Sequence, residues 1–181
     1  MTRSHASLAV LVLLACAGGQ KAQAPMSMTV TSPAFDAGGA IPGKYTCEGP
    51  DPSPPLAWTG VPATARSLAL VVDDPDAPDP AAPRIVWVHW VLYDIPPGTT
   101  GLAENASRTG TGGRDGQNDW KAAGWRGPCP PKGRHRYFFK LYALDNLLGD
   151  LHQPTRAQLE KAMAGHILVR GELIGTYQQS R

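Results

Sequence analysis

The sequence predicts a mainly β fold, a two-sheet antiparallel β-sandwich with one or two short helices. Apolar segments of strand length, rich in Val, Trp, Tyr and Phe, alternate with clusters of Pro, Gly and Asp. The regular alternation of strand and helix patterns that indicates a parallel sheet is missing. Gly and Pro total 38 of 181 residues and charged residues only 18%, which is typical of a compact domain with many ordered loops.

Five segments have the length and composition of strands. They lie around Met28–Thr31, Ser67–Asp73, Ile85–Ile95, His135–Leu144 and Ile167–Tyr177. The stretch from Thr99 to Pro131 has little periodicity and many glycines, and it lacks the GxxxxGK[ST] phosphate-binding motif, so we expect it to be loop.

One helix is predicted near the C-terminus. Thr155 and Gln158 have the spacing of a capping box, which marks a helix start. Leu159 and Met163 follow at a spacing of four and therefore share one face, and Gly165 is a suitable end. We interpret this helix as an element that packs against the sheet.

Residues 1–25 have the layout of an export leader and tether. One arginine precedes the short apolar run from Ala6 to Ala15, and small residues follow, as in a secretory signal peptide. A membrane span needs about 20 apolar residues, more than this run has. Three cleavage alternatives stay open: lipidation of Cys16 at a lipobox-like site, or cleavage at one of two Ala-x-Ala sites, Ala15-Cys16-Ala17 or Ala22-Gln23-Ala24. The sequence thus predicts an exported protein that is periplasmic, secreted or lipid-anchored to a bacterial envelope membrane.

The remaining chain, residues 26–181, has the usual size of one domain. Its charge gives no sign of nucleic acid or of an anionic membrane surface as a partner, because the formal net charge is +2 without a basic block. Contact with a membrane is expected only through a lipid on Cys16. Cys47 and Cys129 form an even pair in an oxidising compartment, which predicts a disulfide; the alternative is two buried thiols acting as small apolar residues.

Candidate binding residues stand near the ends of three predicted strands. Side chains alternate along a strand, so His135 and Tyr137 lie side by side on the apolar face of theirs. Asp74 ends another strand at the mouth of a similar face, with Asp76 in the following turn, unless both belong to a solvated turn.

The third strand carries a histidine among apolar residues. Regular alternation places four side chains on one face: Trp87, His89, Val91 and Tyr93. Since this strand is apolar on both faces, a hydrogen-bonded core histidine is the alternative to a functional one.

Four stretches together resemble the phosphatidylethanolamine-binding protein family, in its bacterial Raf-kinase-inhibitor-like branch. They are IPGKYTCEGPDPSPPLAW (41–58), LALVVDDPDAP (68–78), WVHWVLYDIP (87–96) and GPCPPKGRHRYFFKLYALD (127–145). The resemblance runs from about Met28 to Tyr177 and implies a small anion pocket at one end of the sandwich. It also implies which residues form the pocket: the carboxylates Asp74 and Asp76, the histidine His89, the pair His135 and Tyr137, and the rim residues Pro128 and Pro131, beside which we place Trp87.

These observations predict an exported protein that binds a small anion, phosphate or a phosphoethanolamine-like head group, without catalytic turnover, metal or cofactor. Two imidazoles, a tyrosine hydroxyl and loop amides suit phosphate, and Asp74 or Asp76 suits an ammonium group. Because Asp74 favours a protonated histidine, we expect affinity to fall as pH rises.

Two other functions are weighed against anion binding. A serine-protease inhibitor would use the Pro-rich loops around Asp51 or Asp79 as an exposed binding segment. A hydrolase would use the Asp and His cluster for acid–base work, but the sequence lacks a G-x-S-x-G nucleophile motif and an HExxH metal motif.

Overall fold

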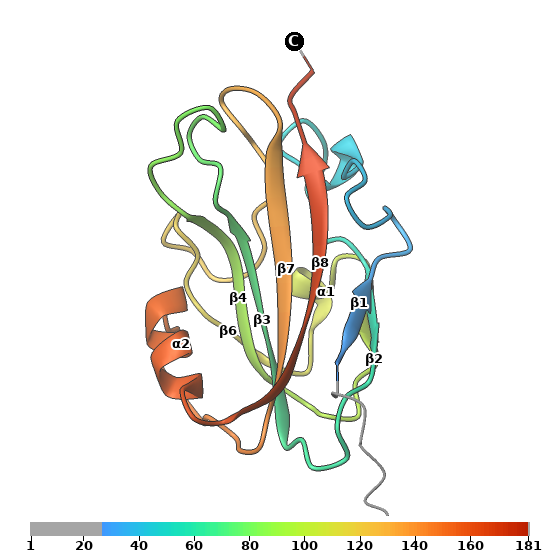
Figure 1. The fold of residues 1–181 in the computed structure, drawn as a ribbon, viewed down its shortest axis with the longest axis vertical. Helices are drawn as coiled ribbons and strands as arrows, with labels where there is room; N and C mark the ends of the chain where they lie inside the picture. The colour runs from blue at the N-terminus through green and yellow to red at the C-terminus, as the bar shows by residue number, and fades with distance from the viewer. Residues whose placement is uncertain (1–26, 181) are drawn as a thin grey trace, which may run out of the picture.

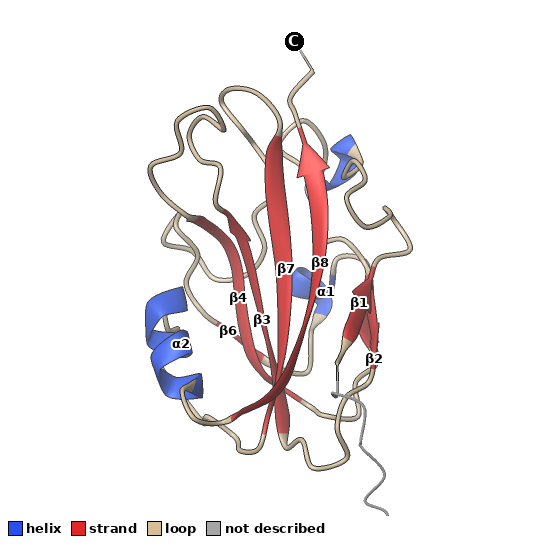
Figure 2. Cartoon of the chain, viewed as in Figure 1, coloured by secondary structure: helices blue, strands red, loops and turns tan. Residues whose placement is uncertain are grey.

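The structure, a computed structural model that describes residues 27–180, consists of two antiparallel β-sheets and short helices (Figures 1 and 2). The strands are β1 (Thr29–Thr31), β2 (Leu56–Thr59), β3 (Ser67–Asp74), β4 (Trp87–Ile95), β5 (Gly101–Leu102), β6 (Arg114–Asp115), β7 (His135–Leu144) and β8 (Ile167–Tyr177). The helices are a 3-10 turn (Gly43–Tyr45), α1 (Ala106–Thr109) and α2 (Arg156–Met163). The predicted two-sheet fold is therefore confirmed.

The larger sheet is covered on both faces. It has the strand order β6-β4-β3-β7-β8, and all residues of its central strand β3 are buried. Leu68, Leu70 and Val72 point into the core shared with the smaller sheet, β1-β2-β5, whereas Ala69 and Val71 pack on the side of α2. Figure 1 shows α2 and the smaller sheet on opposite sides of this sheet. Two covered faces explain why β3 is apolar at nearly every position.

Strand β7 has the bounds and the alternation that the sequence predicts. Its inward residues are buried while Arg136 is exposed and Lys140 is half-buried. It pairs along its whole length with β8, whose far edge is partly covered by the segment around Ala40, which bridges to Thr176. The start of β7, which carries His135 and Tyr137, is thus held in a well-paired part of the sheet.

The predicted alternation along β4 is wrong in one place, because the strand contains a β-bulge. The register against β3 passes from Trp90 opposite Val72 to Val88 opposite Asp73, which leaves His89 without a partner. As a result His89 and Trp90 both point to the inner side of the sheet. Val91 and Tyr93, predicted to share the face of His89, instead belong to the cluster under α2.

Helix α2 begins and packs as predicted. The Thr155 side chain accepts a hydrogen bond from the Gln158 amide, and the Gln158 side chain accepts one from the Thr155 amide at 2.8 Å. Leu159 and Met163 are its buried residues. An ion pair also fixes the helix, since Arg156 Nη1 lies 3.1 Å from the fully buried carboxylate of Asp73.

The prediction of loop from Thr99 to Pro131 is wrong in part. This stretch contains α1 and the two-residue strands β5 and β6, which pair with β2 and β4. Strand β2 was also missed. Strands β2, β5 and β6 have only two to four residues, too few for a periodic pattern, and are defined by their pairing with other strands.

The proposed leader, residues 1–25 with Cys16, lies outside the described residues and stays a prediction. Within residues 27–180 no helix is long and apolar enough to cross a membrane.

Candidate functional site

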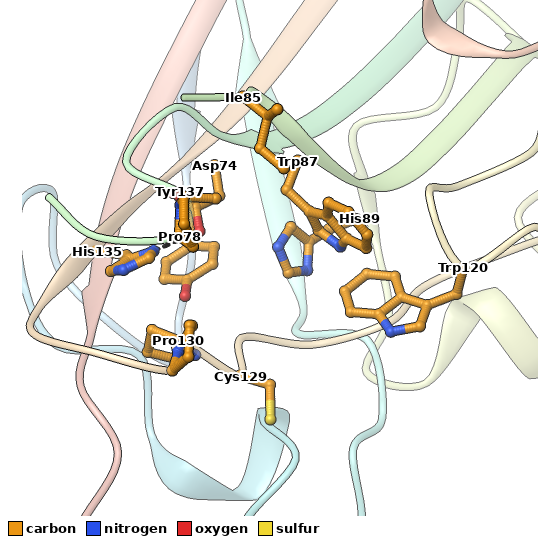
Figure 3. Close-up of a pocket in the computed structure, with 12 residues that line it drawn as sticks. Asp74, Pro78, Ile85, Trp87, His89, Trp120, Cys129, Pro130, His135 and Tyr137 are labelled. Carbon is orange, nitrogen blue, oxygen red and sulfur yellow. Dashed lines mark hydrogen bonds and ion pairs between the residues drawn. The ribbon is translucent and has the colours of Figure 1, made fainter. Parts of the chain in front are cut away.

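A cavity of about 290 Å³ opens at one end of the sandwich, where β3 ends and where β4 and β7 begin. These strand ends lie together because β3 runs antiparallel to both neighbours. The loops that follow β3 and precede β7 form the rest of the wall, at the upper end of the molecule in Figure 1. Figure 3 shows the side chains of this cavity.

Most of the predicted site residues line the cavity. They are Asp74, Trp87, His89, Pro131, His135 and Tyr137. Figure 3 shows that His89 and Tyr137 reach the same space from different strands. Their rings lie edge to face with centroids 5.2 Å apart. The bulge at His89 makes this contact, because regular alternation after Trp90 would turn the histidine to the other side of the sheet.

Asp76 and Pro128 are not among the residues that line the cavity, and their predicted part in ligand binding stays a prediction. The Asp76 carboxylate accepts hydrogen bonds from Arg136 Nε at 2.9 Å, from Arg136 Nη2 at 2.7 Å and from the Arg136 backbone. These bonds hold the pKa of Asp76 below its usual value and make it an anchor for the start of β7. The Pro128 carbonyl accepts a hydrogen bond from the Cys47 amide at 3.1 Å, so Pro128 connects two loops.

His135 is buried with both ring nitrogens engaged. Nδ1 lies 2.7 Å from Asp74 Oδ2 and Nε2 lies 3.0 Å from the Lys132 carbonyl oxygen. Burial raises the pKa of Asp74, while the hydrogen bond with His135 acts in the opposite direction. When Asp74 is ionised, both His135 nitrogens face acceptors, so both are satisfied only if each donates a proton.

His89 is a different kind of histidine. Its Nδ1 lies 2.6 Å from the Arg126 carbonyl oxygen, and the residue is only 2% exposed. Burial lowers the pKa of His89 to about 4. The ring is therefore neutral at pH 7 and donates from Nδ1, because a carbonyl can only accept. The expectation that two imidazoles donate to a bound phosphate is thus not met by His89 in its neutral form.

Tyr137 contributes the free donor of the cavity. It is fully buried, and its hydroxyl has no hydrogen-bond partner among residues 27–180. Burial raises the pKa of Tyr137, so the hydroxyl keeps its proton at all physiological pH values. A buried hydroxyl without a partner costs about 1–3 kcal/mol, a cost that a bound ligand can remove.

The wall opposite the strands is a braced loop. Cys129 lines the cavity and is joined by a disulfide to Cys47. Asp51 fixes the preceding part of the same loop, since its carboxylate accepts hydrogen bonds from Trp125 Nε1 at 3.0 Å and from the Gly127 amide at 3.2 Å. The carbonyl that holds His89 therefore belongs to a segment fixed by side chains from a distant part of the chain.

Sequence reasoning missed two contributors to the site. Trp120 lines the cavity, with its ring centroid 5.1 Å from that of His89, and lies in a stretch without a periodic pattern that could have indicated this. Asp51 was considered only as part of an exposed inhibitory loop. The signal that could have found Asp51 is its place between prolines in the GPDPSPP stretch, where a short acceptor side chain commonly binds backbone amides. In the part of the chain that the structure describes, no cluster of His, Cys, Asp and Glu is arranged to hold a metal ion.

Known proteins resemble this chain over nearly its whole described length. The family model described as phosphatidylethanolamine-binding protein matches residues 31–178. A UPF0098 protein of the archaeon Methanothermobacter thermautotrophicus is 49% identical over 155 residues, which cover 84% of this chain and 99% of the relative. A UPF0098 protein of Chlamydia pneumoniae is 45% identical over 153 residues, covering 84% and 100%.

Two crystal structures share the fold. A homologue of phosphatidylethanolamine-binding protein from Chlamydia trachomatis, CT736, has a TM-score of 0.79 and 42% identity, and the match covers 86% of this chain and 99% of that one. YbcL of E. coli, described as a new member of the mammalian family, has a TM-score of 0.75 and 32% identity, covering 85% and 99%. The chain therefore belongs to the phosphatidylethanolamine-binding protein family.

Proposed function

We propose that the protein is a non-catalytic binding protein whose cavity holds a small phosphate-bearing anion, either a free phosphate compound or a phosphoethanolamine-like head group. The single observation that carries this proposal is the buried, unpartnered hydroxyl of Tyr137 beside His89. An oxyanion accepts readily from such a donor, and hydrogen bonds to a charged partner are about twice as strong as neutral ones. The family name, which refers to a phospholipid with this head group, supports the same ligand class.

The composition of the wall favours binding over chemistry. Among the described residues that line the cavity there is no Ser, Thr or Lys, and the sulfur of Cys129 is held in a disulfide. Nucleophilic catalysis needs an activated hydroxyl, thiol, amine or carboxylate. Here the Asp74 carboxylate is engaged by His135 and by the Asp76 amide, and the raised pKa of Tyr137 keeps its hydroxyl protonated. The lining supports a site that holds its ligand without forming a bond to it.

Calorimetric titration of the purified protein tests this proposal. At pH 6 we expect saturable one-to-one binding of inorganic phosphate or phosphoethanolamine, weakened by about ten- to a hundredfold in Tyr137→Phe, the value of a lost hydrogen bond to a charged group. Tyr142→Phe is the matched control, because Tyr142 lies on the same strand but away from the cavity. Equal affinity of the two variants, or no binding by folded protein, contradicts the proposal.

The same titration separates the two sources of ligand. Tighter binding of phosphoethanolamine than of phosphate indicates a head-group site, whereas the reverse order indicates a site for free phosphate compounds. Glycerophosphoethanolamine, in which the phosphate is a diester as in a lipid, completes the series.

We further propose that residues 1–25 direct export, as the sequence predicts. Cell fractionation and mass spectrometry of the mature N-terminus test this. A lipidated Cys16 at the N-terminus supports an anchored protein, and a chain that keeps Met1 in the cytoplasm contradicts export.

A further inference from the structure

The cavity is large enough for a ligand with more than a phosphate group. At about 290 Å³ it approaches the range of about 300–1,000 Å³ that is typical of sites for small organic molecules. A phosphoethanolamine-like head group has a positive ammonium end in addition to its phosphate. The sequence suggested Asp74 or Asp76 as the partner of this ammonium group.

Both carboxylates are engaged within the protein. Asp74 is the only acidic residue among the described residues that line the cavity, and both of its oxygens have partners. Oδ1 accepts from the Asp76 amide at 2.8 Å, and Oδ2 lies 2.7 Å from His135 Nδ1. The Asp76 carboxylate accepts three hydrogen bonds from Arg136. Neither carboxylate is therefore a free partner for an ammonium group.

The backbone oxygens that face the two histidines are engaged as well. The Lys132 carbonyl lies 3.0 Å from His135 Nε2, and the Arg126 carbonyl lies 2.6 Å from His89 Nδ1. The backbone of Gly127 also hydrogen-bonds the His89 ring. A primary ammonium group carries three N–H donors, and burying donors without acceptors costs free energy. The ammonium end of a ligand thus needs a different kind of partner.

Aromatic rings attract cations without accepting hydrogen bonds, and they form one wall of the cavity. Trp87 and Trp120 both line it, with ring centroids 5.2 Å apart and ring planes at 87°. Figure 3 shows these two rings and His89 on the side of the cavity opposite His135. A cation within about 6 Å of a ring centroid is attracted, most strongly by Trp. Trp120 already attracts one cation, because the Arg126 guanidinium lies over its ring at 5.5 Å.

The phosphate and the ammonium of one head group can reach their partners together. The His89 ring lies between the two sites, with its centroid 5.2 Å from that of Tyr137 and 5.1 Å from that of Trp120. Burial keeps this ring neutral at pH 7, so it adds no positive charge that would repel the ammonium. The Arg126 side chain is exposed, and solvent and salt screen its charge.

We propose that Trp87 and Trp120 form an aromatic subsite that holds the ammonium end of a zwitterionic head group while the Tyr137 hydroxyl donates to its phosphate. This inference rests on the proposed function and names the part of the ligand that determines specificity. The cavity then prefers phosphate esters of amino alcohols to phosphate esters of uncharged alcohols.

Methylation of the nitrogen distinguishes this subsite from an ion pair. A carboxylate would accept hydrogen bonds from the N–H groups of ethanolamine, which choline lacks, so a carboxylate site binds choline esters more weakly. Aromatic rings attract the positive charge itself and bind quaternary ammonium groups well. We therefore expect glycerophosphocholine to bind at least as tightly as glycerophosphoethanolamine.

Calorimetric titration of phosphodiesters into the wild-type protein at pH 7 tests the proposal. Glycerophosphocholine is compared with the ester in which 3,3-dimethylbutanol replaces choline, because this alcohol has the same shape and no charge. We expect the choline ester to bind about three- to thirtyfold more tightly, the strength of a cation–π contact in a partly desolvated site. Glycerophosphoethanolamine should also bind more tightly than the uncharged ester.

Two variants identify the residue responsible. Trp120→Leu keeps an apolar side chain without the ring, so it should lower the affinity for glycerophosphocholine and leave that for the uncharged ester and for inorganic phosphate unchanged. Arg126→Gln is the control, because it removes the guanidinium over the same ring and keeps the backbone carbonyl that holds His89. It should not lower the ratio of the two ester affinities. Should Trp120→Leu not fold, this ratio in the wild type decides.

The outcomes are distinct for the two proposals. If the folded wild type binds neither phosphate nor any of these esters, the proposed function fails and this inference with it. Equal affinity for the choline ester and the uncharged ester overturns the aromatic subsite alone and leaves the anion site in place. Binding of the ethanolamine ester about tenfold or more tightly than the choline ester does the same, because it indicates hydrogen-bond acceptors for N–H groups. A ratio that falls as far in Arg126→Gln as in Trp120→Leu also contradicts the subsite.

Discussion

His89 and His135 lie in the same cavity yet are bound in opposite ways. Both ring nitrogens of His135 are engaged, by the Asp74 carboxylate and the Lys132 carbonyl, whereas His89 is held through Nδ1 by the Arg126 carbonyl and is neutral at pH 7. Residue type alone could not distinguish them. The difference arises from backbone oxygens of the loop before β7, whose position no local sequence pattern specifies.

Burial of His89 makes the stability of the protein depend on pH. The unfolded chain takes up a proton at this histidine near pH 6.5, and the folded chain only near pH 4. Between these values the unfolded state binds more protons, so the free energy of unfolding falls as pH falls from about 6.5 to 4, by up to roughly 3 kcal/mol. Urea unfolding across this range measures it. His89→Asn, which can still donate to Arg126, should show a smaller loss, and equal slopes for both proteins would count against neutral His89.

Tyr137 should contribute to binding and not to stability. Because its buried hydroxyl has no partner in the described part of the chain, Tyr137→Phe should leave the free energy of unfolding unchanged or raise it slightly. Urea unfolding without ligand gives this value, with Tyr142→Phe as the reference. A loss of more than about 1 kcal/mol would show that the hydroxyl has a structural partner, and would weaken the argument for a ligand.

The site residues that lie on regular strands could be predicted from the sequence, because side chains alternate between the two faces of a strand. His135, Tyr137 and Asp74 follow from alternation along β7 and β3 and reach the cavity as expected. Asp76 was not predictable in the same way, because it lies in a turn and its partner Arg136 comes from a strand 60 residues later. Trp120 likewise reaches the site through a loop without periodicity.

At the scale of elements, the bulge in β4 and the docking of α2 are connected through Asp73. This residue lies opposite Val88 at the bulge and points to the α2 side, where its carboxylate contacts Lys140 Nζ at 2.8 Å and Arg156 at 3.1 Å. Sequence alternation gave no sign of the bulge, because an extra residue in an apolar strand leaves the composition unchanged. The helix, in contrast, was predictable from its capping box and its two apolar positions.

Removal of Asp73 should destabilise the protein strongly. The carboxylate is fully buried and binds two cations, so Asp73→Ala leaves both without a buried partner and should lower the free energy of unfolding by about 3 kcal/mol or more. Asp145→Ala is the matched control, because its pair with His166 is at the surface and should change stability by less than about 1 kcal/mol. Thermal unfolding gives the melting temperatures of both variants. Similar values would show that the ion pairs of Asp73 with Lys140 and Arg156 do not stabilise the protein.

At the scale of the whole molecule, the two-sheet fold could be predicted because several segments are apolar and have the length of strands. The long strands β3, β4, β7 and β8 lie close to the predicted segments. The smaller sheet was not predicted, since β2 and β5 have only four and two residues and are fixed by pairing across the chain. The cavity depends on both kinds of element: long strands supply its polar side chains, and loops held from distant segments supply its wall.

The disulfide is the largest covalent constraint on that wall. It connects Cys47 and Cys129 across 82 residues of sequence, and a long closed loop restricts the unfolded chain strongly. Replacement of both cysteines by serine should lower the free energy of unfolding by about 2–5 kcal/mol. Wild-type protein with a reductant should show the same loss, and the double variant should not respond to the reductant. A wild type whose stability is unaffected by verified reduction would contradict this expectation.

The central claim is that the cavity is an anion-binding site, and a phosphate titration followed through the tryptophan indole N–H resonances tests it most directly. Trp87 and Trp120 line the cavity, whereas the indoles of Trp58 and Trp90 donate to Thr99 and Asp115 and serve as internal references. We predict saturable shifts for Trp87 and Trp120 and none for Trp58 and Trp90. The absence of shifts at saturating phosphate, or shifts of equal size for all of these indoles, would contradict the claim.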